Sequence, residues 1–232
     1  MKASQFQEGY TLLIDKPKTW SSFDVVNKLR WQIKNKLKVK KIKVGHAGTL
    51  DPLATGLLVL CTGKFTKKIE EFTADYKTYT GTILLGKTTP SYDLETEFDA
   101  EFPTEHITGA LIDEVRQSFM GKQLQTPPIF SAKQIDGKRA YEFARKGEAV
   151  ELKQNQIEVF DFVLDTSAFP ELHFSVKCSK GTYIRSIAAD FGKALKSGGT
   201  LVELRRTGSG DFDIKDALTV EEAIKMIEES EI

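Results

Sequence analysis

The hydrophobic positions in the first hundred residues predict short strands and one amphipathic helix. The apolar residues of TLLIDKP, 11–17, predict a strand that ends at a turn, and the apolar run 56–61 predicts a buried strand. Ser21, with Asp24 three residues later, has the pattern of a helix capping box, and apolar residues at helical spacing follow it. Alternation over 79–85 predicts a further strand.

The rest of the chain continues this mixture of elements. Residues 104–120 and 182–196 carry apolar residues at helical spacing, and Thr219 is placed to cap a last amphipathic helix. The runs 157–164 and 172–178 flank a Ser-Ala-Phe-Pro turn, which predicts an antiparallel pair. Shorter predictions are a basic helix over 137–147 and a strand over 201–208. Because strands and helices mix without a regular βαβ repeat, the sequence predicts an α+β fold.

Composition favours one globular domain that covers residues 1–232. Apolar residues make up 40% of the chain, enough for a sizeable core, and no internal repeat or long linker divides it. The N-terminus lacks the apolar stretch of a signal peptide, and no run approaches the roughly 18 apolar residues of a membrane-spanning helix. Cys61 and Cys178 lie far apart and lack metal-ligand spacing. We therefore expect a cytoplasmic protein without a metal site.

Charge is unevenly distributed, although 33 basic and 33 acidic residues give a net charge of zero. Between Lys16 and Lys68, thirteen Lys or Arg residues stand against two acids, whereas 91–105 and 216–232 are acidic. A local basic field attracts phosphate groups even on a neutral protein. The lysine-rich run 34–43 has two interpretations: phosphate contact, or a solvated loop in which lysines serve solubility.

The stretch GHAGTLDPLATGLLVL, 45–60, holds polar groups that a turn before a buried strand does not need. It does not fit a P-loop, because the glycine spacing is wrong and no Ser or Thr follows Lys64 directly. The spacing of Gly45 and Gly48 does not fit a dinucleotide-binding fingerprint either. Neither nucleotide-binding motif accounts for its ionisable side chains.

His46 and Asp51 are the candidate chemical groups of this stretch. A hydrolase triad would add a Ser or Cys nucleophile, and a glycosidase would normally need a second carboxylate, which Asp51 lacks nearby. A lone ionised Asp can act as the nucleophile of a glycosyl transfer if a neighbouring Arg lowers its pKa. From these residues alone, the alternative is that Asp51 is a turn residue or helix cap before Pro52.

GHAGTLDPLATGLLVLCTGKFTK resembles the catalytic motif of the TruB family of tRNA pseudouridine synthases, and every fixed position of that motif is present. Further stretches resemble the family's other motifs in the same order: KTYTGTILLGKTT at 77–89, TPPIFSAKQIDGKRAYEFARKGE at 126–148, GTYIRSIAADFG at 181–192 and LRRTGSG at 204–210. The resemblance covers roughly residues 9–210 and favours a catalytic role for Asp51.

The resemblance implies the pseudouridine synthase fold, with a mixed, mainly antiparallel sheet and flanking helices. It implies an isomerase that converts uridine 55 in the T loop of tRNA to pseudouridine, without cofactor or metal. The target base would be flipped into the pocket. Asp51 would be the essential carboxylate, which attacks C1′ of the sugar or C6 of the base, or supports a glycal route.

The resemblance also implies roles for other residues. His46 helps to displace the flipped base, Tyr79 stacks on the uracil, and Arg185 pairs with Asp51. Tyr183 and Leu204 line the pocket, with plain core packing as their alternative. Candidates for contact with RNA phosphates are Lys16, Lys38, Lys40, Lys41, Lys64, Arg139 and Arg145, and Lys16 and Lys64 have a structural role as the alternative.

Residues 124–150 resemble the insertion that folds over the T arm in this family. Many members continue into a PUA-type C-terminal domain, and because this sequence ends at Ile232 we expect that domain to be absent. We expect a stand-alone, monomeric enzyme whose partner is the T arm of tRNA, with no membrane and no obligate protein partner. The alternatives are a non-catalytic RNA-binding protein, such as a tRNA folding chaperone, and an enzyme for other uridines in T-loop-like RNA.

Overall fold

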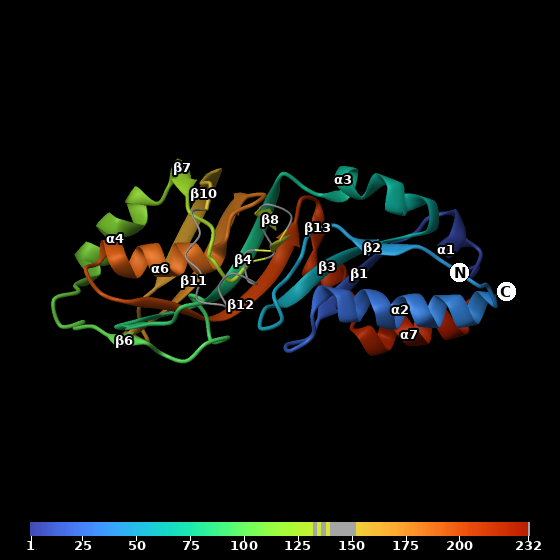
Figure 1. The fold of residues 1–232 in the computed structure, drawn as a ribbon, viewed down its shortest axis with the longest axis horizontal. Helices are drawn as coiled ribbons and strands as arrows, with labels where there is room; N and C mark the ends of the chain where they lie inside the picture. The colour runs from blue at the N-terminus through green and yellow to red at the C-terminus, as the bar shows by residue number, and fades with distance from the viewer. Residues whose placement is uncertain (132–133, 136–137, 140–151, 232) are drawn as a thin grey trace. The chain divides into compact units, whose positions relative to one another are not determined.

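The computed structural model describes residues 1–131, 134–135, 138–139 and 152–231. The chain forms two compact units, the first made of Met1–Tyr79 and Leu204–Ile232 and the second of Thr80–Glu203. Two strands, β4 (Tyr76–Leu85) and β12 (Gly199–Ser209), contribute residues to both units (Figure 1). The organisation as a single catalytic domain stays a prediction.

The first unit is built on a mixed sheet. Its own strands are β1 (Thr11–Lys16), β2 (Val44–His46), β3 (Thr55–Thr62) and β13 (Phe212–Asp213). The order is β1-β3-β12-β4, with β13 paired to β12 and β2 paired to β3. β1 and β2 are antiparallel to β3, whereas β12 runs parallel to it, with Arg206 opposite Gly56. The parallel pairing brings the late LRRTG segment beside the strand that follows Asp51.

Among the helices of the first unit, α2 (Ser22–Leu37) and α7 (Val220–Glu229) cover its sheet. The unit's other helices are α1 (Gln5–Glu8) and α3 (Ile69–Phe72), with 3-10 helices η1 (Gly63–Lys68) and η2 (Ile214–Asp216). α2 and α7 lie side by side (Figure 1), and each begins at a capping box, Ser21 with Asp24 and Thr219 with Glu222. Their shared core is fully buried and includes Leu29, Ile33, Leu58, Leu60, Ala223 and Ile227. This core fixes α2 against β3.

The second unit has a sheet in the order β12-β4-β11-β10-β7. Its own elements are β5 (Lys87–Thr88), β6 (Ala100–Glu101), α4 (Gly109–Ser118), β7 (Gly121–Gln125), β8 (Gln134–Ile135), β9 (Lys138–Arg139), β10 (Asn155–Asp165), β11 (Glu171–Ser179) and α6 (Ile184–Ala194). β10 is antiparallel to both of its neighbours. The Phe162 ring meets those of Phe174 and Phe191 edge-on, which joins the sheet to α6.

The predicted α+β class and the mixed, mainly antiparallel sheet are confirmed. The strands predicted near 11–17, 56–61 and 79–85 are present as β1, β3 and β4. The helix predicted over 104–120 begins only at Gly109, because the Thr108 hydroxyl accepts a hydrogen bond from the Leu111 N–H and caps it there.

The basic helix predicted over 137–147 is wrong at Lys138 and Arg139, which lie in β9. The Asp136-Gly137 dipeptide before them is a hairpin-turn signal, and the helix prediction passed over it. The other residues of that prediction, Arg145 among them, lie outside the described residues, as does most of the predicted insertion 124–150 beyond Ser131.

Within the described ranges, no helix is long and apolar enough to cross a membrane. The same residues contain no group of three His, Cys, Asp or Glu side chains that could hold a metal ion.

Candidate active site

Asp51 lies in a short loop that leaves β2 and returns as β3. The loop begins where the Ala47 N–H donates to the Val59 carbonyl at 2.9 Å, and it turns where the Ala54 N–H donates to the Asp51 carbonyl at 3.1 Å. Gly56 has a φ of 100°, and a Cβ there would lie 2.3 Å from the Arg206 carbonyl oxygen. Only glycine therefore allows β3 to start against β12. The loop leaves Asp51 half-buried.

The first turn of α2 anchors this loop. The buried Ser22 hydroxyl donates to the Leu50 carbonyl oxygen and accepts from the Leu50 N–H. On the other side of Asp51, the Pro52 carbonyl accepts a hydrogen bond from the Thr19 N–H at 2.8 Å. Both neighbours of Asp51 are thus held by the segment that starts α2.

Arg206 anchors the loop from β12. Its side chain is almost completely buried, and its guanidinium donates to three carbonyl oxygens: Leu57 at 2.7 Å, Gly48 at 3.1 Å and Thr49 at 3.4 Å. A buried guanidinium is stable only when such acceptors surround it. The adjacent Arg205 lies on the other face of β12 and forms a partly exposed ion pair with Asp15.

Lys16 supplies a second buried cation. It is fully buried at the end of β1, and its ammonium donates to the carbonyls of Pro17 at 3.0 Å, Trp20 at 2.6 Å and Pro52 at 3.4 Å. Burial lowers the pKa of Lys16 from 10.5 to about 8, and the charge of Asp51 opposes that shift. Two of these carbonyls belong to the turn between β1 and α2, and that of Pro52 belongs to the Asp51 loop, which favours the structural role of Lys16 over phosphate contact.

His46 ends β2 at the entrance to the loop. Burial lowers its pKa below the usual value, and the positive charge of Arg206 lowers it further. Its Nδ1 is buried, and a hydrogen bond with the Gly48 backbone opposes the lowering of the pKa only in part. His46 is therefore a neutral imidazole near pH 7, which can contact a base without bringing a charge to the site.

The first unit also holds Tyr79, which is predicted to stack on the uracil, and Leu204, which is predicted to line the pocket. Tyr79 is 7% exposed and lies in β4. Leu204 lies in β12, and its carbonyl accepts a hydrogen bond at 3.4 Å from the hydroxyl of Thr55, the first residue of β3. Their places in the sheet suit both the predicted role and plain packing, so that role stays a prediction.

Arg185 and Tyr183 belong to the second unit. The Tyr183 backbone is held by the Gln125 amide, which accepts from its N–H at 2.8 Å and donates to its carbonyl at 3.0 Å. Arg185 is buried, with its Nε 3.5 Å from an Asp93 carboxylate oxygen and one Nη donating to the Ser91 carbonyl at 3.3 Å. The predicted pairing of Arg185 with Asp51 stays a prediction.

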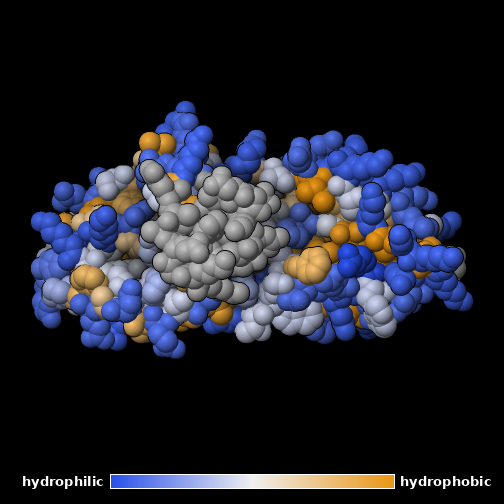
Figure 2. Space-filling model, viewed as in Figure 1, coloured by the Kyte–Doolittle hydropathy of each residue, from blue (hydrophilic) through white to orange (hydrophobic). Residues whose placement is uncertain are grey.

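The remaining candidates for phosphate contact come from several elements, and Lys41 and Lys64 line one shared hollow. Lys38, Lys40 and Lys41 are exposed and lie between α2 and β2, whereas Lys64 lies in η1. Arg139 lies in β9. On the face drawn in Figure 2, hydrophilic side chains cover most of the coloured surface.

Comparison with known proteins settles the family. A family model described as the N-terminal domain of TruB family pseudouridylate synthases matches residues 34–184, and one described as the C-terminal domain of tRNA pseudouridylate synthase B matches residues 185–231. The chain belongs to the TruB family. It is therefore an enzyme of the isomerase class, a pseudouridylate synthase.

Curated relatives cover nearly the whole chain. A protein of Flavobacterium johnsoniae named tRNA pseudouridine synthase B is 56% identical over 95% of this chain and 96% of its own length. A protein of Phocaeicola vulgatus with the same name is 55% identical over 98% of this chain and 97% of its own length. The TruB resemblance inferred from the motifs is confirmed.

Solved structures support the same fold. The chain resembles one in the crystal structure of a Cbf5-Nop10-Gar1 complex, with a TM-score of 0.70 and 26% identity over 95% of this chain. It also resembles one in an H/ACA RNP bound to a substrate RNA containing 2′-deoxyuridine, with a TM-score of 0.67 and 25% identity over 95% of this chain. This TruB chain spans about 55% of the length of those solved chains. The predicted pseudouridine synthase fold is confirmed.

Sequence reasoning missed three residues that the structure brings to these TruB motifs. Ser22 and Arg206 hold the Asp51 loop, and Asp93 lies against Arg185. One local signal was available for Arg206, because two adjacent arginines in a strand must point to opposite faces and one of them faces the core. Ser22 resembles any residue of a helix first turn, and Asp93 lies in an acidic stretch that predicts a solvated loop.

Proposed function

We propose that this TruB protein is a tRNA pseudouridine synthase that converts uridine 55 of the T loop to pseudouridine, with Asp51 as the essential carboxylate. The observation that carries the proposal is the anchoring of the Asp51 loop by Ser22, Lys16 and Arg206 from three elements. A turn or cap residue would not need such support. The name tRNA pseudouridine synthase B of the relatives supports tRNA as the substrate.

The reaction exchanges one glycosidic bond for another within a single nucleotide. The N1–C1′ bond breaks, the uracil turns, and a C5–C1′ bond forms; C5 then loses its hydrogen as a proton, and N1 ends protonated. No electron, group donor or metal enters this balance. Asp51 acts by attack on C1′, by attack on C6, or by supporting a glycal route, and each route needs its ionised carboxylate.

The other residues position the base. The target uridine is flipped out of the loop, and the neutral imidazole of His46 helps to fill the space it leaves. Tyr79 stacks on the uracil, Tyr183 and Leu204 line the pocket, and Arg185 keeps Asp51 ionised.

Exposed lysines bind the RNA backbone. Lys38, Lys40, Lys41 and Lys64 contact phosphates, together with Arg139 and Arg145 from the segment predicted to close over the T arm. The enzyme works in the cytoplasm as a monomer, with the T arm of tRNA as its partner and no obligate protein subunit.

The test is release of tritium from T-arm stem-loops that carry the label at C5 of a single uridine. Forming the C5–C1′ bond expels that hydrogen, so the signal reports the isomerisation itself. We expect release when the label is at position 55 and none when it is at another uridine of the same loop. Release from several positions would contradict the site specificity, and binding without release would favour a non-catalytic RNA-binding protein.

A further inference from the structure

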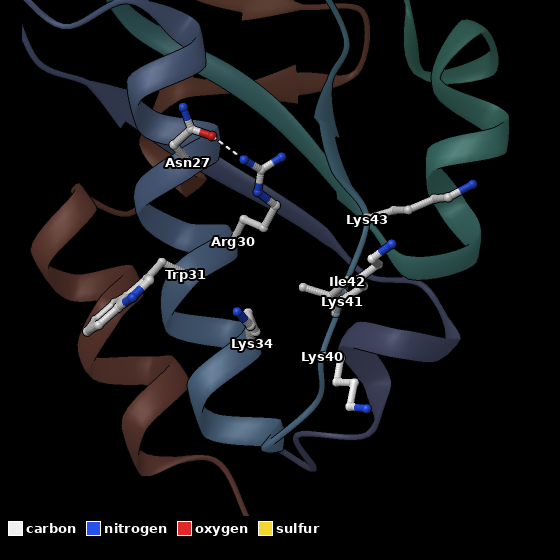
Figure 3. Close-up of a pocket in the computed structure, with 8 residues that line it drawn as sticks. All are labelled: Asn27, Arg30, Trp31, Lys34, Lys40, Lys41, Ile42 and Lys43. Atoms are coloured by element: carbon white, nitrogen blue, oxygen red, sulfur yellow. Dashed lines mark hydrogen bonds between the residues drawn. The ribbon is translucent and has the colours of Figure 1, made fainter.

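A basic cleft lies between α2 and the segment that leads into β2. It has a volume of about 730 Å³, and its lining includes Arg30, Trp31, Lys34, Lys40, Lys41 and Lys43 (Figure 3). None of the residues that line it is acidic. We call it the α2 cleft.

The backbone explains how these cations come together. Arg30 and Lys34 are four residues apart, so they share one face of α2. Lys38 ends the helix in the left-handed conformation, with a φ of 53°, and the chain then returns alongside α2 through residues 40–43 (Figure 3). This return brings a second group of lysines, Lys40, Lys41 and Lys43, to the border of the cleft. In Figure 3 their side chains extend on the side of the segment away from α2, and Ile42 points toward the helix.

The α2 cleft concentrates positive charge that the described part of the chain does not neutralise. Arg30 donates to the Asn27 side-chain carbonyl, and no ion pair of the five cations occurs among the described residues. Like charges at this spacing repel one another and lower the stability of the helix. By contrast, Lys36 on the same helix donates to the Glu228 carbonyl at 2.7 Å. The cleft is therefore suited to an external polyanion.

The distance along α2 between the cleft and the Ser22 anchor beside Asp51 indicates which part of a bound RNA would contact the cleft. Ser22 holds Leu50, next to Asp51, and Arg30 and Lys34 follow 8 and 12 residues later. At 1.5 Å per residue, they lie about 12 and 18 Å along the helix from that anchor. One RNA strand advances about 3 Å per nucleotide along its helix axis, so this span corresponds to roughly four to six nucleotides. A phosphate in the cleft is therefore too far from a uridine at Asp51 to belong to that uridine.

We infer that the α2 cleft binds the sugar-phosphate backbone of the stem that carries the target loop, as a contact separate from the pocket around Asp51. The inference rests on the proposed function, which supplies RNA as the partner. Trp31, which is also among the lining residues, is 57% exposed and projects from α2 on the side away from residues 40–43 (Figure 3). An acidic protein segment is the competing occupant.

The test compares two stem-loops with the same target loop, one with a stem of about three base pairs and one with about ten, by fluorescence anisotropy at several salt concentrations. The double variant Lys40→Ala/Lys41→Ala removes two charges from the cleft. The matched control, Lys28→Ala/Lys36→Ala, removes two charges from α2 outside the residues that line it.

We expect wild type to bind the long stem more tightly than the short stem. The cleft variant should lose roughly tenfold in affinity for the long stem at low salt and about two units of salt slope, with short-stem affinity retained. The control variant should keep the preference for the long stem.

Two results would overturn the inference. Equal loss on both stems would place the cleft contact in the loop, and unchanged binding to both would assign the cleft to another occupant, such as an acidic protein. Tritium release from the short stem is measured in parallel on wild type. Its absence would count against the proposed isomerisation, while the anisotropy data would still report whether the cleft binds a stem.

Discussion

The Ser22 hydroxyl makes two hydrogen bonds to the backbone of Leu50, donating to its carbonyl oxygen at 3.0 Å and accepting from its N–H at 2.8 Å. Leu50 directly precedes Asp51, so the first turn of α2 sets where the carboxylate lies. This pair of bonds fixes both the position and the orientation of the Leu50 backbone.

Replacing Ser22 should lower both the free energy of unfolding and kcat, whereas replacing the neighbouring Ser21 should lower the free energy of unfolding alone. Ser22→Ala leaves a buried N–H and carbonyl of Leu50 unpaired, which we expect to lower the free energy of unfolding by about 1–3 kcal/mol. The looser loop should lower kcat about tenfold, because small displacements of a reacting group are costly. The matched control is Ser21→Ala, which removes the cap of the same helix and about 1 kcal/mol without touching Leu50. Denaturant unfolding and single-turnover kinetics check both variants; an equal loss of kcat in Ser21→Ala would contradict the anchor role.

Arg206 should not tolerate a change to lysine. A single ammonium cannot reproduce the planar fork that reaches Leu57, Gly48 and Thr49, so we expect Arg206→Lys to lower kcat at least about tenfold, with stem-loop affinity within a few-fold of wild type. Arg205→Lys is the control, because its partly exposed pair with Asp15 contributes about 0–1 kcal/mol. Similar kcat values for the two variants would show that the fork does not position the loop.

The low pKa of Lys16 predicts an alkaline limb in the activity. As pH rises through about 8, the ammonium becomes an amine with two N–H groups for three carbonyl acceptors, and the positive charge near Asp51 disappears. We therefore expect kcat to fall above pH 8 in wild type. Lys16→Met should have a lower kcat at every pH and should lack this alkaline limb. A fall in kcat that comes from titration of the substrate would occur in both proteins. An identical profile in both proteins would assign the limb elsewhere.

The lowered pKa of Lys16 has the opposite effect on stability: kcat should fall as pH rises, but the contribution of Lys16 to the free energy of unfolding should increase. The folded pKa of Lys16 lies below its ordinary 10.5, so between about pH 8 and 10.5 the unfolded chain binds more protons than the folded chain. The contribution of Lys16 to the free energy of unfolding therefore rises with pH across that window. Urea titrations should show the free energy of unfolding of wild type rising with pH relative to that of Lys16→Met across this window. A constant difference between the two proteins would assign the pH dependence to another group.

Arg185 should matter more for turnover than for binding. If it keeps Asp51 ionised, Arg185→Ala lowers kcat and shifts the acid limb of the pH profile upward, because an unpaired carboxylate protonates at higher pH. Asp93→Asn keeps Arg185 but removes the acid beside it, and serves as the control for local disturbance in the second unit. An unchanged kcat and acid limb in Arg185→Ala would refute the pairing.

Local signals in the sequence were enough for much of the fold. The Ser21–Asp24 box placed the start of α2, and alternation with a short turn placed β10 against β11, because these features depend on neighbours in the chain. The GHAGTLDP motif placed Asp51 in a loop for the same reason. The role of Arg206 could not be found this way, since its acceptor at Leu57 is 149 residues distant and depends on β12 lying parallel to β3. The two hydrogen bonds from Ser22 to Leu50, 28 residues away, likewise depend on tertiary packing.

The measurement that tests the central claim most directly compares wild type with Asp51→Asn on one T-arm stem-loop labelled with tritium at C5 of uridine 55. The substitution keeps the size of the side chain and removes its charge and nucleophile. We predict no tritium release by Asp51→Asn and an affinity for the stem-loop within a few-fold of wild type. Release at the wild-type rate would show that Asp51 is not the essential carboxylate, and equal loss of binding and turnover would show that it is structural.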